Sequence, residues 1–277
     1  MNFNMANKIA IVTGGSRGLG KDMALKLAAR NIDVIITYQS QKDAANDVVK
    51  QIGNLGGKGV ALHFDSSIIS SINDFVKEVN GALATSWNCS TFDFLVNNAG
   101  IGATIPYLQA TESDFDRFMN IHFKSVYFLT QQLLPIMNDG GSIVNISTGT
   151  TRFANPGYSI YASMKGAIEV FTRYLAKEVG PRGIRANVLA PGPIETDFNN
   201  AFIRNNPDRK KMMASNTALG RAGEANDIGG VVAFLCADES RWVTGPMAFQ
   251  RDAAARWACR RIAFERLCMQ AIRRRDE

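Results

Sequence analysis

The sequence places a tyrosine and a lysine four residues apart, at Tyr161 and Lys165 in the run Tyr-Ala-Ser-Met-Lys. In a helix this spacing puts both side chains on one face, about one turn apart. A phenol with an ordinary pKa of about 10 is a poor acid or base at neutral pH, and a neighbouring ammonium lowers that pKa by favouring the phenolate. The pair therefore predicts a general acid–base for a reaction that moves a hydroxyl proton.

The same pair is also typical of the exposed face of an ordinary amphipathic helix, so the neighbouring sequence must decide between a catalytic pair and two surface residues. The predicted helix follows an apolar strand whose end reads Asn145–Thr148, Asn-Ile-Ser-Thr. Amide and hydroxyl side chains at the end of a strand are the groups that hold and polarise a polar substrate. This context favours the catalytic interpretation of Tyr161 and Lys165.

A glycine-rich turn near the N-terminus follows the apolar run Lys8–Thr13 and has the spacing GxxxGxG. Glycine permits positive φ and a close approach of the backbone to a phosphate. The helix that begins there offers free N–H groups and the positive end of its dipole. A plain strand-to-helix turn is the alternative, but its place between the first strand and first helix favours a dinucleotide site. The residues assigned to it are Gly14, Ser16, Arg17, Gly18, Leu19 and Gly20.

Short apolar runs alternate with helical patterns along most of the chain, which predicts a parallel sheet covered by helices on both faces. We therefore expect one α/β domain, a doubly wound Rossmann fold, whose ligands bind beyond the carboxyl ends of the strands. The predicted strands are Lys8–Thr13, Asp33–Tyr38, Gly59–Phe64, Phe92–Val96, Ser142–Ser147 and Arg185–Ala190. The predicted helices are Gly20–Arg30, Lys42–Leu55, Ile72–Leu83, Glu112–Met137 and Tyr158–Gly180.

Five motifs in order resemble those of the short-chain dehydrogenase/reductase family. They are Thr13–Gly20, Asn97–Gly100, Asn120, Tyr161 with Lys165, and Pro191 with Gly192, and the likeness covers about residues 6–246. The chain looks most like the 3-oxoacyl-(acyl-carrier-protein) reductases. The resemblance implies that a ketone or acyl-thioester carbonyl is reduced to an alcohol, or the reverse, by hydride transfer, with Tyr161 as the proton donor.

The segment after the second strand predicts which nicotinamide cofactor is used. NAD enzymes carry an acid there to bind the ribose 2′-hydroxyl, whereas this chain has no carboxylate until Asp43. Arginine binds phosphate with a planar, two-pronged set of donors, so we expect Arg17 and Lys42 to bind a 2′-phosphate and the cofactor to be NADP(H). The alternative is that both are solvated surface charges. The residues assigned to this end are Arg17, Tyr38, Gln39, Ser40 and Lys42.

The family resemblance implies further roles around the same site. Asp65 and Ser66 would hold the adenine. Asn120 would kink its helix and hold a water that links Lys165 to solvent, while Lys165 would also bind the nicotinamide ribose. The adenosine ribose side would be lined by Asn98, Ala99 and Gly100, and the nicotinamide would be covered by Pro191, Gly192, Ile194 and Thr196.

One catalytic position departs from the family pattern. The family usually has serine thirteen residues before the tyrosine, and this chain has Thr148 there. Threonine carries the same hydroxyl donor and acceptor, so the role of polarising a carbonyl survives the change. We assign the role to Thr148, with the neighbouring Ser147 as the alternative. We expect His122 to be structural and to lie on a different helix face from Asn120.

Composition excludes several function classes. The net charge is +6, but residues 247–277 supply +4 of it, so the body shows no basic stripe for nucleic acid. Four cysteines without ligand spacing and two histidines predict no metal site. No stretch reaches the roughly 18 apolar residues of a membrane span, and no leader is visible. We expect a cytoplasmic protein.

The last 31 residues do not fit the family pattern. The family normally adds one more strand ending in Asp-Gly-Gly, and residues 247–277 offer neither, so we predict no strand there. We divide the chain into a catalytic domain, 1–246, and an atypical basic tail, 247–277. The tail is an altered coding region, a basic amphipathic helix that docks on a membrane or partner, or a disordered or self-packed segment. The resemblance implies a homodimer or homotetramer, and the altered C-terminus puts the tetramer in question.

Two other functions stay open on the same residues. Some relatives of the fold are epimerases or dehydratases, although the intact Tyr161/Lys165 pair makes plain redox chemistry simpler. The chain could also bind the nucleotide without catalysis, as a scaffold. Residues 197–219 would form a lid whose apolar side chains either line a substrate pocket or pin the lid to the body.

Overall fold

The computed structural model describes residues 7–201, 203–245 and 247–249. Its seven-stranded sheet has the order β3-β2-β1-β4-β5-β6-β9, and every neighbouring pair is parallel. The order reverses between β1 and β4, as in a doubly wound fold. The predicted Rossmann architecture is confirmed. The strands are β1 Ile9–Val12, β2 Asp33–Tyr38, β3 Gly59–His63, β4 Phe92–Asn97, β5 Met137–Ile146, β6 Arg185–Ala190 and β9 Met247–Phe249.

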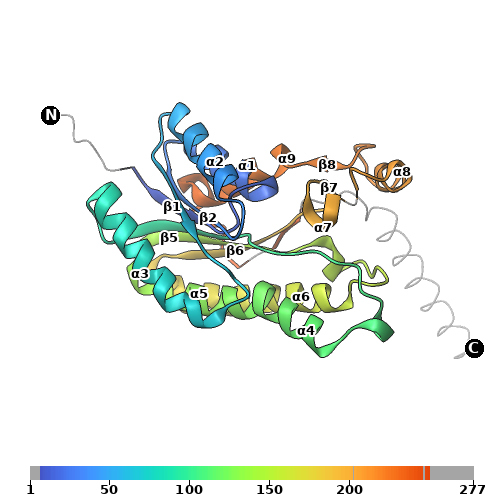
Figure 1. Cartoon of the computed structure of the whole chain (residues 1–277). Coiled ribbons are helices and arrows are strands. Elements are labelled where there is room, and N and C mark those ends of the chain that lie inside the picture. The colour runs from blue at the N-terminus through green and yellow to red at the C-terminus, as the bar shows by residue number, and fades with distance from the viewer. Residues whose placement is uncertain (1–6, 202, 246, 250–277) are drawn as a thin grey trace, which may run out of the picture.

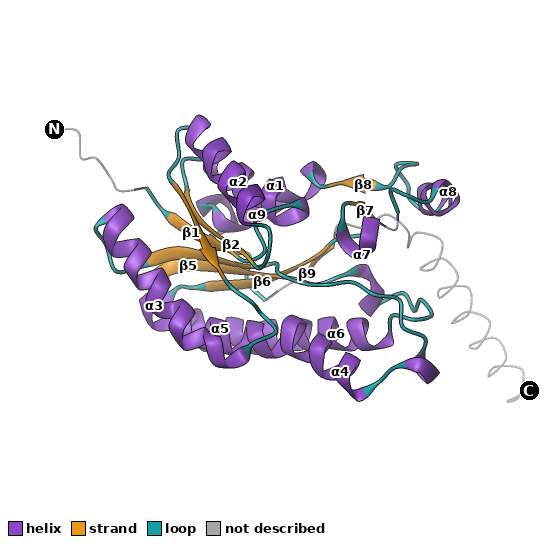
Figure 2. Cartoon of the chain, viewed as in Figure 1, coloured by secondary structure: helices purple, strands orange, loops and turns teal. Residues whose placement is uncertain are grey.

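Helices cover both faces of the sheet (Figure 1). One core joins the sheet to α1 Gly18–Ala28, α2 Lys42–Asn54 and α9 Asn226–Cys236. The other core joins it to α3 Ile72–Ala82, α5 Ser125–Leu133 and α6 Ser159–Val179. Figure 2 shows the strands enclosed between these two layers, with α4 Glu112–Met119 beside α6.

Burial on two faces explains why the strands read as continuous apolar runs. All four residues of β1 are buried. Ala10 and Val12 belong to one core, and Ile9 and Ile11 belong to the other. Because alternate side chains of a strand point to opposite faces, a strand covered on both faces needs apolar residues at every position.

The helix predicted over 112–137 is interrupted. α4 ends at Met119, a π-helical turn spans Asn120–Lys124, and α5 ends at Leu133. The irregular turn thus begins at Asn120, where the family resemblance implies a kink. The predicted end at Met137 is wrong, because a turn containing Pro135 closes the helix and Met137 pairs with Phe92 as the first residue of β5.

The prediction of no strand after residue 246 is wrong. Met247–Phe249 forms β9 and pairs with Val188–Ala190 of β6. The Gly245 amide donates to the Ala186 carbonyl at 2.8 Å and directs the chain onto this edge. A strand at an edge needs backbone N–H and C=O groups more than a particular sequence, so the missing glycine pair does not prevent it. Residues 250–277, with the predicted amphipathic helix, lie outside the described residues.

Two short elements frame the segment between β6 and α9. β7 Ile194–Glu195 pairs with β8 Gly223–Glu224, and between them lie α7 Phe198–Ala201 and α8 Pro207–Ser215. Within the described ranges, no helix has the length and apolarity to span a membrane. The same residues contain no His, Cys, Asp and Glu cluster that would hold a metal ion.

Candidate active site

Tyr161 lies near the start of α6, opposite the carboxyl end of β5, and is buried at its phenol. Its side chain is hydrogen-bonded to that of Thr148, two residues beyond the end of β5. Burial raises the pKa of Tyr161 to about 12, although the Thr148 hydrogen bond acts in the opposite direction. The predicted lowering of this pKa by Lys165 is wrong, because burial dominates and Lys165 is not among the groups that shift this pKa. The phenol is therefore protonated at neutral pH and is a proton donor.

Lys165 is 4% exposed, and its Nζ donates to the Ile146 carbonyl at 2.8 Å. The same atom lies 5.9 Å from the centre of the Tyr161 ring. Burial lowers the pKa of Lys165 to about 8. An amine with this pKa gains and loses a proton close to neutrality, which suits a group that returns protons to the site.

The buried amine gives the fold a pH dependence that can be measured. The pKa of Lys165 falls from 10.5 to about 8 on folding, so the unfolded chain binds more protons between those pH values. The free energy of unfolding therefore rises with pH in this window, by about 2 kcal/mol between pH 8 and pH 10 relative to a Lys165→Met variant. Denaturant unfolding of both proteins at pH 8 and pH 10 measures it. If the free energy of unfolding changed equally with pH in the two proteins, the lowered pKa of the buried Lys165 amine would be contradicted.

The structure separates the roles of the two neighbouring hydroxyls. The Thr148 hydroxyl meets Tyr161, whereas the Ser147 hydroxyl donates to Glu169 Oε1 at 2.7 Å. Backbone at Thr148 is extended, and adjacent residues of an extended chain point in opposite directions. The geometry thus supports the assignment of Thr148, and Ser147 faces away from the phenol.

Glu169 belongs to this site and was missed by the sequence prediction. Its Oε1 accepts hydrogen bonds from Ser147 Oγ at 2.7 Å and from Thr151 Oγ1 at 2.8 Å. These two residues flank the turn that carries Thr148, so the carboxylate holds the turn on both sides. The sequence did contain a signal for Glu169, because Tyr161, Lys165 and Glu169 follow one another at a spacing of four and so share one helix face.

We expect Glu169→Ala to lower kcat by about 10- to 100-fold, because Thr148 loses its fixed position relative to Tyr161. Glu169→Gln keeps an acceptor oxygen and should retain most of the activity. Affinity for the nucleotide should not change. The effect should vanish in a Thr148→Ala background, since residues that act through one another are not additive. Full additivity in this cycle, read from kcat, would show that Glu169 acts elsewhere.

His122 is fully buried against Tyr161, with the two ring centres 5.1 Å apart and the planes at 85°. Its Nε2 lies 2.9 Å from the Ile101 carbonyl oxygen. Burial, assisted by the charge of Lys165, holds the pKa of His122 well below its usual value, so the ring is neutral. The expected structural role is supported by this packing. The sequence did not indicate the contact with Tyr161, because the two residues lie on different elements that only the tertiary fold brings together.

The glycine-rich turn forms a backbone cradle at the start of α1. Gly14 and Gly18 have φ of +66° and +54°, and a Cβ built on Gly20 would lie 2.2 Å from the Gly14 carbonyl oxygen. Only glycine fits such an approach. Among the described side chains, none is hydrogen-bonded as a cap at the start of α1, so its N–H groups face outward for an anion. The predicted residues Ser16, Arg17 and Leu19 lie in the same turn.

The run that follows β4 clamps this turn from the next strand. Asn98 Nδ2 donates to the Thr13 carbonyl at 2.9 Å, and the amides of Asn98 and Ala99 donate to Thr13 Oγ1. Gly100 lies against the His122 ring. Asn98 and Ala99 therefore join two strand ends through their hydrogen bonds, a positioning contact that the resemblance did not specify.

The residues predicted for the adenosine end also gather at strand ends. Tyr38 is paired with His63 across β2 and β3, and Gln39 Nε2 donates to Asp65 at 2.9 Å. Burial acts to raise the pKa of Asp65, but hydrogen bonds from Ser67 and Gln39 lower it overall, which keeps the carboxylate ionised. Ser66 follows Asp65, and the side chains of Arg17, Ser40 and Lys42 are exposed.

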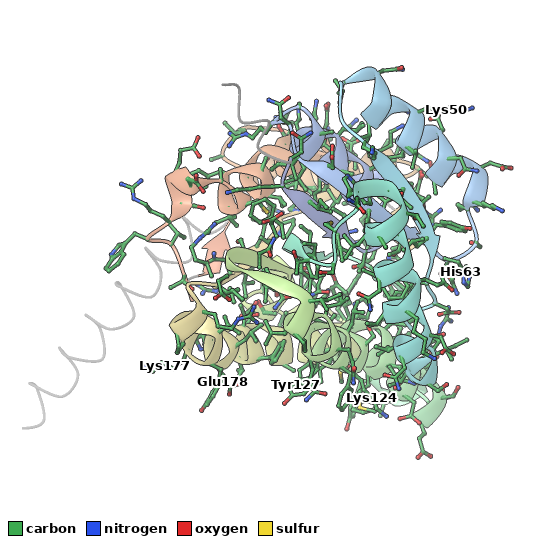
Figure 3. The ribbon with its side chains drawn as sticks, turned by 90° about the vertical axis from the view of Figure 1, so that its left-hand side faces the viewer. Lys50, His63, Lys124, Tyr127, Lys177 and Glu178 are labelled. Atoms are coloured by element: carbon green, nitrogen blue, oxygen red, sulfur yellow. The ribbon has the colours of Figure 1, made fainter. Side chains whose placement is uncertain are left out.

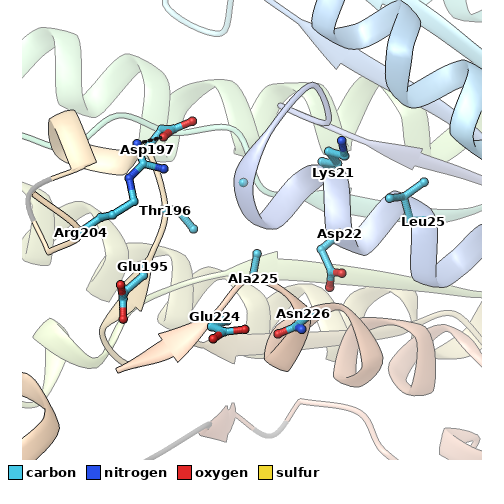
Figure 4. Close-up of a pocket in the computed structure, with 11 residues that line it drawn as sticks. Lys21, Asp22, Leu25, Glu195, Thr196, Asp197, Arg204, Glu224, Ala225 and Asn226 are labelled. Carbon is cyan, nitrogen blue, oxygen red and sulfur yellow. Dashed lines mark ion pairs between the residues drawn. The ribbon is translucent and has the colours of Figure 1, made fainter. Parts of the chain in front are cut away.

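The loop after β6 lies against both the turn that carries Thr148 and the glycine-rich turn before α1. The Pro191 carbonyl accepts from the Gly149 amide at 3.1 Å, next to Thr148, and Gly192 follows it. Thr196 lies within van der Waals distance of a Cβ built on Gly18, and Ile194 starts β7. A pocket of about 400 Å³ lies beside Thr196, and its lining includes the ion pair between Asp197 and Arg204, 2.6 Å apart. Figure 4 shows this pair at one edge of the pocket.

Comparison with known proteins agrees with this geometry. The family model described as enoyl-(acyl carrier protein) reductase matches residues 14–249. The 3-oxoacyl-[acyl-carrier-protein] reductase FabG of Staphylococcus epidermidis is 33% identical over 86% of this chain and 95% of its own.

Two solved ketoreductases have the same fold. The reductase LugOII, which acts at C1 in lugdunomycin biosynthesis, has a TM-score of 0.84 and 34% identity, covering 88% of this chain and 96% of its own. The angucycline C-6 ketoreductase LanV with bound NADP has a TM-score of 0.84 and 32% identity, covering 87% and 93%. The chain belongs to the short-chain dehydrogenase/reductase family.

Proposed function

We propose that this protein is an NADP(H)-dependent oxidoreductase that reduces a ketone or 3-oxoacyl carbonyl to an alcohol, or catalyses the reverse. The observation that carries the proposal is the hydrogen bond between the Tyr161 phenol and the Thr148 hydroxyl, with the Lys165 amine 5.9 Å from the phenol ring. Two adjacent hydroxyl groups suit a carbonyl oxygen, which accepts two hydrogen bonds.

The residues of the site have distinct tasks in the reduction. Thr148 donates a hydrogen bond that polarises the carbonyl, and Tyr161 gives its proton to the oxygen as the carbon is reduced. The proton returns to Tyr161 by way of Lys165, and the resemblance assigns to Asn120 the water that links Lys165 to solvent. The bound nicotinamide supplies the hydride that the carbonyl carbon accepts.

The turn at the start of α1 suits a dinucleotide, because Gly20 lets the backbone fold closely onto the Gly14 carbonyl and no described side chain caps the start of the helix. Arg17 in the glycine-rich turn and Ser40 and Lys42 after β2 are exposed, and all three are proposed to bind the ribose phosphate. These donors favour NADP(H), and the bound NADP of LanV supports the same choice. The residues proposed to hold the nicotinamide are Pro191, Gly192, Ile194 and Thr196.

The test is consumption of NADPH in the presence of ketones and an acetoacetyl thioester, followed by the nicotinamide absorbance, with nucleotide affinity measured alongside. Ketone-dependent oxidation of NADPH with formation of one alcohol per nicotinamide is the expected result. Tight NADPH binding without turnover of any carbonyl would favour the scaffold function instead.

We propose a cytoplasmic location. The two free cysteines among the described residues, Cys89 and Cys236, suit a reducing compartment.

We also propose that the protein forms a homodimer through an aromatic face on α5 and α6. Tyr127 and Phe171 are in ring contact at 4.8 Å, and Tyr127 also contacts Phe128. Tyr174 on α6 is 67% exposed. Figure 3 shows Tyr127 directed outward between Lys124 and Glu178. Contiguous exposed apolar surface with a polar rim is typical of an interface.

Light scattering of the purified protein should give twice the chain mass. A Tyr127→Lys/Tyr174→Lys variant should give a monomer at the same concentration, because a buried unpaired ammonium opposes association. Trp242→Lys is the control, since Trp242 is a fully exposed aromatic outside this face. A dimer that survives the double change would place the contact elsewhere.

A further inference from the structure

Two further aromatic rings lie close to Tyr161. The Phe198 ring lies 6.0 Å from the Tyr161 ring at 51°, and the Tyr158 ring lies 6.4 Å from it at 72°. Phe198 comes from α7, forty residues after Tyr158, so the fold brings them together. None of the proton-transfer steps proposed above uses either ring.

The Phe198 ring is held in place yet open on one side. It packs on the backbone of Gly102, where a Cβ would lie 2.6 Å from Phe198 Cε1, so the close approach requires glycine. Phe198 is nevertheless 43% exposed to solvent. A large ring fixed on one side and exposed beside a reactive phenol is a surface for a ligand.

Hydrogen bonds tie Tyr158 to the same segment. Asn199 Nδ2 donates to the Tyr158 hydroxyl at 3.1 Å, and Thr104 Oγ1 donates to the same oxygen at 3.2 Å. Asn199 has φ of +53°, a conformation that asparagine tolerates better than most residues. The loop after β4, the start of α6 and α7 thus form one wall, which we name the aromatic wall: Tyr158, Phe198 and the hydrogen-bonded Asn199 and Thr104.

We propose that the aromatic wall binds the flat aromatic ring of a benzo-fused cyclic ketone and presents its carbonyl to Tyr161 and Thr148, in preference to a linear 3-oxoacyl chain. This inference rests on the proposed function. Ring–ring contacts contribute beyond the area they bury. A rigid ring system also loses fewer rotatable bonds on binding than an acyl chain, so a preformed wall favours it.

Matched probes separate the two substrate classes. 2-Tetralone is a fused bicyclic ketone, 4-phenyl-2-butanone carries the same ring and ketone on an open chain, and S-acetoacetyl-N-acetylcysteamine is a linear 3-oxoacyl thioester. The wild type should have the highest kcat/KM for 2-tetralone. Phe198→Leu keeps the apolar volume but removes the ring, and should lower kcat/KM for 2-tetralone by about 10-fold, mainly through KM. The thioester should change by less than about 2-fold.

Phe234→Leu is the matched control, since Phe234 is 39% exposed on α9 and takes no part in the wall. Affinity for 2-naphthol, a flat bicyclic phenol that cannot be reduced, is measured by calorimetry with NADP⁺ present. Weaker 2-naphthol binding in Phe198→Leu but not in Phe234→Leu would uphold the wall. The same binding result without turnover of any ketone by the wild type would uphold the wall and reject the proposed function. A wild-type preference for the thioester, or equal loss with all three probes, would overturn the inference and leave the reductase function standing.

Discussion

Tyr161→Phe should reduce kcat by about 10³-fold, within the range found for loss of a general acid. The substitution removes one oxygen and keeps the ring that packs against His122 and Phe198. Neither the cradle at Gly14–Gly20 nor the predicted phosphate-binding side chains should move, so the Kd for NADPH should stay within about 2-fold. Steady-state rates with excess ketone and a fluorescence titration of NADPH measure the two effects.

The control for this loss is Tyr107→Phe, because Tyr107 is 79% exposed and far along the chain from α6. It should behave as the wild type in both measurements. Retention of more than about a tenth of the activity in Tyr161→Phe would exclude Tyr161 as the proton donor. Loss of NADPH binding together with activity would instead indicate damage to the fold, which thermal unfolding of the variant would reveal.

An Arg17→Ala/Lys42→Ala variant should bind NADPH about 100-fold more weakly, because each charge-assisted hydrogen bond to a phosphate contributes about 1.5–3 kcal/mol. Its affinity for NADH should be nearly unchanged, since NADH carries no 2′-phosphate. Both side chains are exposed near the carboxyl ends of β1 and β2. Parallel titrations with the two nucleotides at one ionic strength, repeated at higher salt, measure the change.

Lys50→Ala provides the comparison, because Lys50 is an exposed cation on α2 that points away from the body in Figure 3. It should leave the ratio of the two affinities unchanged. A wild type that binds NADH more tightly than NADPH would overturn the cofactor assignment, while the reductase chemistry of Tyr161 would stand.

The sequence by itself determined the order and type of most elements and the place of the cofactor turn. β2 runs over Asp33–Tyr38 as predicted, and α2 differs from its prediction by one residue. These features depend on neighbours along the chain: apolar runs for strands buried on both faces, and glycines where the backbone must approach itself. The alignment of Tyr161 with Lys165 was predictable for the same reason, since helical spacing fixes it.

The tertiary structure decided what surrounds those residues. Burial of the Tyr161 phenol raises its pKa, and the Ile146 carbonyl binds the amine of Lys165. The choice of Thr148 over Ser147 depends on Glu169, which is more than twenty residues away. Desolvation and long-range hydrogen bonds depend on every group that packs around an atom, and spacing along the chain carries no record of them.

Spacing along the chain also could not predict the strand at the edge of the sheet or the aromatic wall. Backbone pairing with β6 places β9 at Met247–Phe249 although the usual side-chain pattern is missing. Phe198 reaches Tyr161 because Gly102, from a distant loop, leaves space for its ring. Periodicity reports how a segment folds locally, whereas shape complementarity between segments arises only when the whole chain is packed.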